Sequence, residues 1–349
     1  MWFAVPGGVD LPTGGATYDR KVIAALRAAG WHIDVLGWPA TFPFPDEAAR
    51  RAVAASLAAL PDNALVVIDG LALGTLPALA RQQAQRLRLV ALVHHPLALE
   101  AGLSPEVATR FAAEEREALR HVRAVIVTSA TTAATLATDF AVSPDRIAVA
   151  APGVELRPPR SGVRAPGPLR ILALGQVAPR KAHHILVAAL AGVMDLDFSC
   201  VIAGDLRRSP ETAAALVRQI AQLGLSERVA LAGTVSDAES DRLHAEADLF
   251  ALASTYEGYG MALAEAMAWG LPILATTGGA IPEVVPPEAG ILVPPGDITA
   301  FTETLRMLIT DPARRATLAE GARNAAVRFG GWDTTAARIA EAIRSLAPA

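Results

Sequence analysis

Two glutamates, Glu257 and Glu265, stand eight positions apart in the stretch EGYGMALAE. The stretch follows the apolar run DLFALAS, which predicts a strand, and MALAEAMAWG after it predicts a helix that ends near Gly270. Glu257 then precedes the helix, and Glu265 lies inside it. Gly258 and Gly260 would let the backbone turn tightly and approach a ligand closely.

This arrangement suits the binding of an anion that also carries hydroxyl groups. The first turn of a helix offers unpaired N–H groups and partial positive charge to a phosphate or sugar oxygen, and each carboxylate accepts hydrogen bonds from hydroxyls. Two acids beside an anion site therefore fit a polyhydroxylated phosphate ester. The alternative is that Glu257 only caps the helix and Glu265 is a solvated charge, because acids are common near helix starts.

Two cations, Arg180 and Lys181, lie in the stretch ALGQVAPRKAHH, where an apolar strand passes through a turn into a helix. Cations at the carboxyl end of a strand suit a diphosphate. Without an anion they would be unfavourable beside the positive end of the helix dipole, so a solvated basic surface is the less favoured interpretation. His183 and His184 follow them, and we expect both to be exposed and without a role.

Glycine and histidine pairs follow two strands of the first half. The stretch DLPTGGATYDR puts Gly14 and Gly15 between the first strand and the first helix, without a full GxGxxG dinucleotide fingerprint. VALVHHP ends the fourth strand with His94 and His95. A single histidine at such a position is more often a structural hydrogen bonder than a catalytic group.

The elements that must position these residues alternate apolar strands with alanine-rich helices, which predicts doubly wound parallel sheets. The proline-rich residues 152–168 lack an apolar period and predict a linker between two domains. At 349 residues the chain also exceeds the size of about 250–300 residues at which one core stops growing. Ligands of such sheets bind at the carboxyl ends of the strands. The chemistry is therefore expected in the strand-to-helix loops.

The segment WDTTAARIAEAIRSLA predicts a final helix that begins at Trp332. Its apolar stripe passes through Ala337, Ile339, Ala340 and Ile343, so it needs a surface to pack on.

Composition excludes several classes of protein. The chain is 52% hydrophobic and 19% charged with a net charge of −4, which indicates a globular protein without the basic footprint of a nucleic-acid binder. Cys200 is the sole cysteine, so no internal disulfide, cysteine-rich metal site or CxxC motif exists. GxSxG, HEXXH and paired metal-ligand spacing are absent, which disfavours hydrolases and metalloenzymes.

The apolar runs predict no membrane anchor. A strand directly after Met1 leaves no room for a secretion leader, and every apolar run is shorter than the roughly 20 residues that cross a bilayer. We therefore expect a cytoplasmic protein with a small-molecule partner. Peripheral contact with a membrane stays open.

The block EGYGMALAEAMAWGLPILATTGGAIPEVV, followed by GILVPPGD, resembles the signature of retaining glycosyltransferases of family 4, also called glycosyl transferases group 1. The resemblance covers nearly the whole chain, from TGG through ALGQVAPRKAHHILVAAL and VIAGD. It implies the GT-B fold, with two facing Rossmann-like domains. Residues 1–158 would form the acceptor-side domain and 168–331 the nucleotide-sugar donor domain. Residues 332–349 would cross back and pack on the first.

The resemblance also implies a role for each residue of the E-x7-E motif. Glu257 would bind hydroxyls of the donor sugar, and the amides of Gly258, Tyr259 and Gly260 would meet the sugar and phosphate. Glu265 would hold the ribose hydroxyls.

The remaining motifs acquire roles in the same way. Lys181 would neutralise the leaving nucleotide, helped by Arg180, because this chain has Gln176 where many members have arginine. Gly14 and Gly15 would form a loop beside the donor phosphates. His94, more plausibly than His95, would lie beside the reacting sugar. The chain departs from the pattern at Ala262, where members often have proline.

The implied activity is transfer of a sugar from a nucleotide-diphosphate sugar to an acceptor hydroxyl, with retention at the anomeric carbon and without a metal or other cofactor. The acceptor would be a saccharide, a lipid-linked compound or a small molecule in glycan, polysaccharide or glycolipid synthesis. Two alternatives stay open: a GT-B sugar-nucleotide epimerase and a non-enzymatic two-domain sugar-binding protein.

Overall fold

The computed structural model describes residues 1–158 and 167–346. Much of the predicted linker, residues 159–166, therefore lies outside the described part of the chain. The chain divides into two compact units. Unit 1 combines residues 1–153 with the segment that starts at Gly330, and unit 2 comprises Val154–Phe329. The assignment of acceptor and donor to separate domains stays a prediction.

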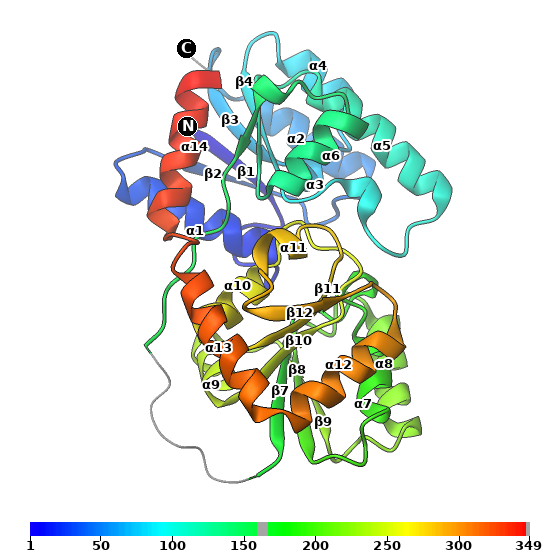
Figure 1. Ribbon diagram of the computed structural model, residues 1–349. Helices are drawn as coiled ribbons and strands as arrows, with labels where there is room; N and C mark the ends of the chain where they lie inside the picture. Colours follow the sequence, from blue (N-terminus) through cyan, green and yellow to red (C-terminus); the bar gives the residue numbers. More distant parts are fainter. Residues whose placement is uncertain (159–166, 347–349) are drawn as a thin grey trace. The chain divides into compact units, whose positions relative to one another are not determined.

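Unit 1 is built on a six-stranded parallel sheet with the order β2-β1-β3-β4-β5-β6 (Figure 1). Its central strands are largely apolar because parallel sheets are covered on both faces, and β3 and β5 are buried throughout, whereas the edge strand β2 is partly exposed. The strands are β1 (Trp2–Pro6), β2 (Asp34–Trp38), β3 (Leu65–Asp69), β4 (Arg88–Val93), β5 (Ala124–Val127) and β6 (Ile147–Val149).

Several helices of unit 1 begin at residues whose side chains cap them. Thr13, Asp46 and Ser129 each accept a hydrogen bond from a backbone N–H of the helix that follows. The helices that precede the final one are α1 (Gly14–Ala28), α2 (Glu47–Ala58), α3 (Gly70–Leu73), α4 (Pro77–Gln83), α5 (Pro105–Leu119) and α6 (Ala130–Asp139). Short 3-10 turns are η1 (Leu97–Leu99) and η2 (Pro144–Arg146).

Unit 2 is built on a second six-stranded parallel sheet, with the order β12-β11-β10-β7-β8-β9. The strands are β7 (Leu169–Leu174), β8 (Phe198–Ala203), β9 (Val229–Gly233), β10 (Leu249–Leu252), β11 (Ile273–Thr276) and β12 (Gly290–Val293). The helical segments are η3 (Pro179–Lys181), α7 (His183–Ala191), α8 (Pro210–Gln222), α9 (Asp237–Glu246), α10 (Met261–Ala268), α11 (Ile281–Val284), α12 (Ile298–Thr310) and α13 (Pro312–Ala326).

Each sheet reverses its winding direction at one place. In unit 1 the chain passes from β1 to the edge strand β2 and returns to β3 on the other side of β1. In unit 2 the strands β7 to β9 lie on one side and β10 to β12 on the other. The prediction of doubly wound parallel sheets is confirmed. Ligands of such sheets bind where the direction reverses, which points to the loops after β1, β3, β7 and β10.

The final helix, α14 (Trp332–Leu346), packs on α1, β5 and β6 of unit 1 (Figure 1, red). The Thr335 hydroxyl donates a hydrogen bond to the carbonyl oxygen of Ala151 at 2.7 Å, and the rings of Trp332 and Tyr18 are 5.7 Å apart. The prediction that this helix returns to the first domain is confirmed.

The predicted apolar stripe of α14 was wrong at one position. Ala337 is exposed, and Ala336 is buried in its place together with Ile339, Ala340 and Ile343. Ala336 shares a face with this group because it lies three residues before Ile339 and four before Ala340.

Truncation of this stripe should destabilise unit 1. We expect Ile339→Ala to lower the free energy of unfolding by about 2–5 kcal/mol, because the side chain is 1% exposed and its removal leaves a cavity. Urea denaturation followed by tryptophan fluorescence measures the change. Arg338→Ala is the matched control, since that side chain is 66% exposed. Equal stability of the two variants would contradict the packing of α14.

Within the described residues, no helix combines the length and the apolar character needed to cross a lipid bilayer.

Candidate active site

In unit 2, the structure brings Arg180 and Lys181 to Glu257. The two cations lie on η3, which follows β7, and Glu257 lies between β10 and α10. Lys181 Nζ is 2.7 Å from Glu257 Oε1, and Arg180 Nη1 is 3.1 Å from Glu257 Oε2. Because β7 and β10 are the strands between which the sheet reverses its winding, this cluster lies at the place where a ligand is expected.

Backbone contacts hold the two loops together. The Thr255 N–H donates to the carbonyl oxygen of Arg180 at 2.8 Å, and Arg180 Nη1 donates to the carbonyl oxygen of Tyr256 at 2.7 Å. The Lys181 stem passes over Gly175, where an added Cβ would lie 3.2 Å from Lys181 Cε. These contacts fix the direction in which both cations extend.

The backbone of Glu257 is fixed from the other side by the loop after β11. Glu257 and Gly279 form a parallel bridge, and the Ala280 N–H donates to the Glu257 carbonyl oxygen at 2.9 Å. Gly279 has a φ of +63°, and an added Cβ would lie 2.3 Å from the Glu257 carbonyl oxygen. The Ser254 hydroxyl donates to Glu257 Oε1 at 2.5 Å. The carboxylate is therefore held by both its side chain and its backbone.

The Glu257 carboxyl group is ionised despite being 5% exposed. Burial raises its pKa, but Lys181 and Arg180, with hydrogen bonds from Lys181 and Ser254, lower it from the ordinary 4.5 to about 2. The cluster thus holds two positive charges and one negative charge. It keeps a net positive charge that suits an anion.

This pKa predicts a loss of stability in acid. Because the folded pKa lies below the unfolded one, the contribution of Glu257 is complete above pH 4.5 and is lost as the pH falls towards 2. We expect the unfolding free energy of the wild type to fall by about 3 kcal/mol more than that of Glu257→Gln over this range. Urea denaturation at several pH values measures both curves.

Glu239→Gln provides the control. Glu239 also has a lowered pKa, caused mainly by its hydrogen bond with Arg242, but it lies on the surface, where such pairs contribute little. If the unfolding free energies of the wild type and Glu257→Gln fell in parallel as the pH decreased, the lowered pKa of Glu257 would be disproved.

The other predicted donor-binding residues lie on the loop before α10 and on the helix itself. Gly260, with a φ of +103°, immediately precedes α10, and Gly258 and Tyr259 come just before it. Tyr259 is buried, and Glu265 is half-buried within α10. These positions agree with the predicted order of loop and helix. Their contacts with a donor stay predictions.

In unit 1, the structure brings Gly15 to His94. Gly15 lies in the first turn of α1, and an added Cβ there would be 3.2 Å from His94 Cδ2. Gly14 has open space at the same point, since an added Cβ would meet nothing within 4 Å. The side chain of His95 instead pairs with Glu100, with its Nε2 3.1 Å from Glu100 Oε2.

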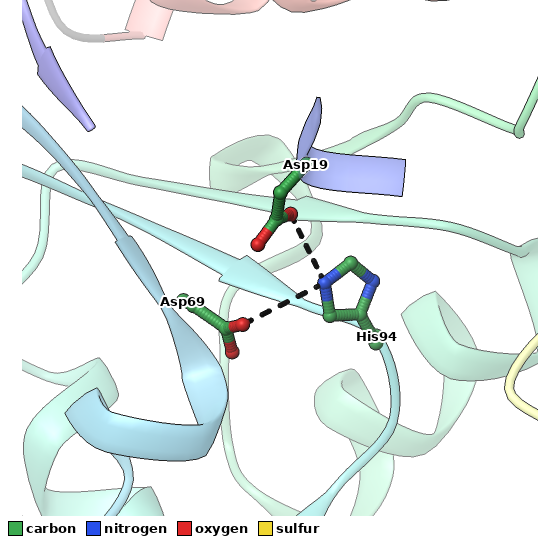
Figure 2. Close-up of side chains that lie close together, drawn as sticks. All are labelled: Asp19, Asp69 and His94. Atoms are coloured by element: carbon green, nitrogen blue, oxygen red, sulfur yellow. Dashed lines mark ion pairs between the residues drawn. The ribbon is translucent and has the colours of Figure 1, made fainter. Parts of the chain in front are cut away.

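Two buried acids that were not predicted as site residues complete this cluster. His94 Nε2 lies 3.2 Å from Asp19 Oδ1 and 3.9 Å from Asp69 Oδ2 (Figure 2). Asp69 ends β3 and accepts a hydrogen bond from the Leu71 N–H at 2.7 Å, which caps α3. An acid at a strand end was a usable signal for Asp69. No comparable signal pointed to Asp19, because its partner, His94, lies on another element.

His183 was predicted to be exposed, and this was wrong. It is 3% exposed, with Nε2 3.3 Å from the carbonyl oxygen of Gly175. Burial, and then Lys181, lower its pKa to about 4, so the ring is neutral. His183 belongs to the buried face of α7, whereas His184 is exposed as predicted.

Two family models match adjoining parts of the chain. The model described as Glycosyltransferase Family 4 matches residues 12–157, and the one described as Glycosyl transferases group 1 matches residues 159–325.

Curated relatives match over most of the chain. The MMP alpha-(1->4)-mannosyltransferase of Mycolicibacterium hassiacum is 31% identical over 316 residues, which cover 86% of this chain and 75% of the relative. The D-inositol 3-phosphate glycosyltransferase of Salinispora tropica is 32% identical over 279 residues. That match covers 70% of this chain but only 57% of the relative.

Solved structures align with this chain over nearly its whole length. Sucrose-phosphate synthase from Thermosynechococcus elongatus aligns with a TM-score of 0.82 at 22% identity, covering 99% of both chains. HepE from Anabaena, solved in complex with UDP-glucose, aligns with a TM-score of 0.76 at 22% identity, covering 99% of this chain and 100% of HepE. At this level of identity the likeness shows the fold, which is GT-B.

Proposed function

Because the chain belongs to the family 4 (group 1) glycosyltransferases, we propose that it transfers a sugar from a nucleotide-diphosphate sugar to an acceptor hydroxyl with retention at the anomeric carbon. The observation that carries the proposal is the cluster of Arg180, Lys181 and Glu257. It places two cations beside one fixed carboxylate where the unit 2 sheet reverses its winding. The cations would bind the diphosphate, and the carboxylate would accept hydrogen bonds from sugar hydroxyls.

The mechanism assigned to this cluster is electrostatic. As the bond between the sugar and the diphosphate breaks, negative charge grows on the leaving phosphate, and Lys181 and Arg180 would stabilise it. Cations that the fold already holds in place act without reorganisation at the moment of reaction. Glu257 keeps both in place through its two oxygens. The amides at the start of α10 would add to this stabilisation.

The departing phosphate would then take the proton of the acceptor hydroxyl as the new glycosidic bond forms. No step of this proposal requires a metal ion. Transfer that is unchanged by a chelator would support it, whereas loss of transfer on chelation, restored by a divalent cation, would contradict it.

The identity of the donor can be found by thermal shift of the full chain against a panel of nucleotide sugars. A panel with glucose and mannose donors is apt, because relatives of this chain include a mannosyltransferase and HepE was solved with UDP-glucose. A donor at about 100 times its Kd should stabilise the fold by about 2.7 kcal/mol. The stabilising donor is then incubated alone and with candidate saccharide, lipid-linked and small-molecule acceptors.

The products distinguish the possible activities. A glycoside with the anomeric configuration of the donor supports the proposal, and an inverted product contradicts retention. A changed sugar nucleotide formed from donor alone would identify an epimerase, and binding without any product would identify a sugar-binding protein. The cytoplasm remains the predicted location.

Substitution of Glu265 should affect donor binding more than chemistry. We expect Glu265→Ala to raise the donor KM about 10- to 100-fold with little change in kcat, because ribose hydroxyls are remote from the breaking bond and are bound equally in the ground and transition states. Initial rates over a range of donor concentrations separate the two constants. Glu288→Ala, a surface variant in the same unit, is the control. A large fall in kcat at constant KM would refute the role.

A further inference from the structure

Asp19 and Asp69 place two buried carboxylates around one imidazole nitrogen. Asp19 is 0% exposed and Asp69 5% exposed, and both lie within ion-pair distance of His94 Nε2. Neither carboxylate oxygen of Asp19 accepts a hydrogen bond from another described group. Asp69 uses one oxygen to cap α3 and directs the other at His94.

The charges of this cluster must be balanced. Two carboxylates in a buried site repel each other, and burial of an unpaired carboxylate is strongly unfavourable. Among the described residues, His94 is the cationic group that pairs with Asp19 and with Asp69. The imidazole can offset one of the two negative charges, and only when it carries two protons.

The groups around the ring favour this state. Asp19 comes from α1, Asp69 from the end of β3, and the Tyr18 ring meets the imidazole edge-on at 5.3 Å. Burial alone would lower the pKa of His94, but Asp19 and then Asp69 raise it to about 9. Burial and Asp19 raise the pKa of Asp69 to about 7, which His94 opposes. The next histidine along the chain, His95, pairs with Glu100.

We infer that Asp19 is a positioning residue that, together with Asp69, holds His94 as an imidazolium with Nε2 between the two carboxylates and its Nδ1–H presented to an oxygen of a bound substrate. Figure 2 shows Nδ1 on the side of the ring away from both acids. The choice of ligand rests on the proposed function, whereas the charge state of His94 does not.

The consequence is a fixed hydrogen-bond donor. A neutral histidine can present either a donor or an acceptor, depending on which nitrogen carries the proton, but an imidazolium presents donors at both nitrogens. The ligand group opposite Nδ1 must therefore be an acceptor, such as a hydroxyl or phosphate oxygen. The interaction should persist from neutral pH until His94 loses its proton.

NMR titration of the full chain with 15N-labelled histidine tests the charge state without requiring activity. His94→Gln assigns the resonance. We expect His94 in the wild type to titrate near pH 9. In Asp19→Asn its midpoint should fall by at least one unit (roughly tenfold in proton affinity), because the nearer carboxylate is neutralised. Asp69→Asn should lower it as well and keeps the test valid if Asp19→Asn does not fold.

Glu117→Gln is the matched control, because it removes a carboxylate 3.0 Å from another histidine, His121. It should leave the titration of His94 unchanged. A wild-type His94 that titrates near 6.5, or one that is indifferent to both aspartate substitutions, would overturn the inference. Stoichiometric binding of Zn²⁺ or Mn²⁺ at micromolar concentration, seen as a change in the His94 resonance, would also overturn it by making the three residues a cation site.

The pH dependence of kcat/KM links the imidazolium to catalysis. In Asp19→Asn, the alkaline limb of kcat/KM should move to lower pH by the same amount as the NMR midpoint. The loss should appear first in the KM of the substrate that His94 contacts and only then in kcat. A limb that stays in place while the NMR midpoint moves would refute the contact with the substrate. If no transfer occurs with any donor, the proposed function fails, and the NMR result still decides the charge state of His94.

Discussion

Replacement of Lys181 by methionine should lower kcat about 100- to 1,000-fold at saturating donor, the usual loss when one fixed stabilising group is removed from a transition state. Methionine keeps most of the apolar stem over Gly175 and removes the charge that lies 2.7 Å from Glu257. Folding should be affected less, because Arg180 still pairs with the buried carboxylate. Turnover and thermal unfolding of the same sample separate the two effects.

Lys21→Met is the matched control, since it removes an ammonium group from α1 without touching the cluster. We expect its turnover to be close to that of the wild type. Near-normal turnover of Lys181→Met at saturating donor would exclude Lys181 from transition-state stabilisation. An equal loss in both variants would point to a general effect of charge.

Gly279→Ala should damage both the fold of unit 2 and its activity. The new Cβ would lie 2.3 Å from the Glu257 carbonyl oxygen and 2.9 Å from its backbone nitrogen, so the loop must move and the carboxylate with it. The positive φ adds strain for any residue with a Cβ. Together these effects should cost about 2–4 kcal/mol of unfolding free energy.

Gly296→Ala separates strain from the clash. Gly296 has a φ of +81°, but an added Cβ there would meet nothing within 4 Å. We expect this variant to lose only about 1–2 kcal/mol and to keep its turnover. If urea denaturation and initial rates give the same values for both variants, the close contact between Gly279 and Glu257 does not position the carboxylate.

Sequence alone predicted the strands well for a physical reason. A parallel strand covered on both faces is a largely continuous apolar run, as in β3 and β5. Such runs can be recognised in the sequence without knowledge of the fold. Helix faces were less certain, because a shift of one residue moves a side chain by more than a quarter turn. That shift explains the misplaced Ala337, whereas His183 was expected on the surface only because of its polarity.

The site was predictable only in part. Resemblance to a family indicated Glu257 and Lys181, and the structure joined them in an ion pair. It could not indicate Asp19 or Ser254, whose importance comes from partners on other elements. A buried aspartate in a helix looks like any other aspartate until the fold brings a histidine to it. Pairings between distant segments are a property of the tertiary structure.

The path of the chain has a consequence for synthesis of the protein on the ribosome. Unit 1 is completed by α14, which is translated after the whole of unit 2. Multidomain chains generally fold from the N-terminus as they are synthesised. Here the sheet of unit 1 is synthesised first, but the surface of α1 and β5 stays uncovered until α14 is made. Unit 2 has all of its strands before unit 1 receives its last helix. The nascent first unit is therefore the part of the chain that most needs protection from aggregation until α14 has been synthesised.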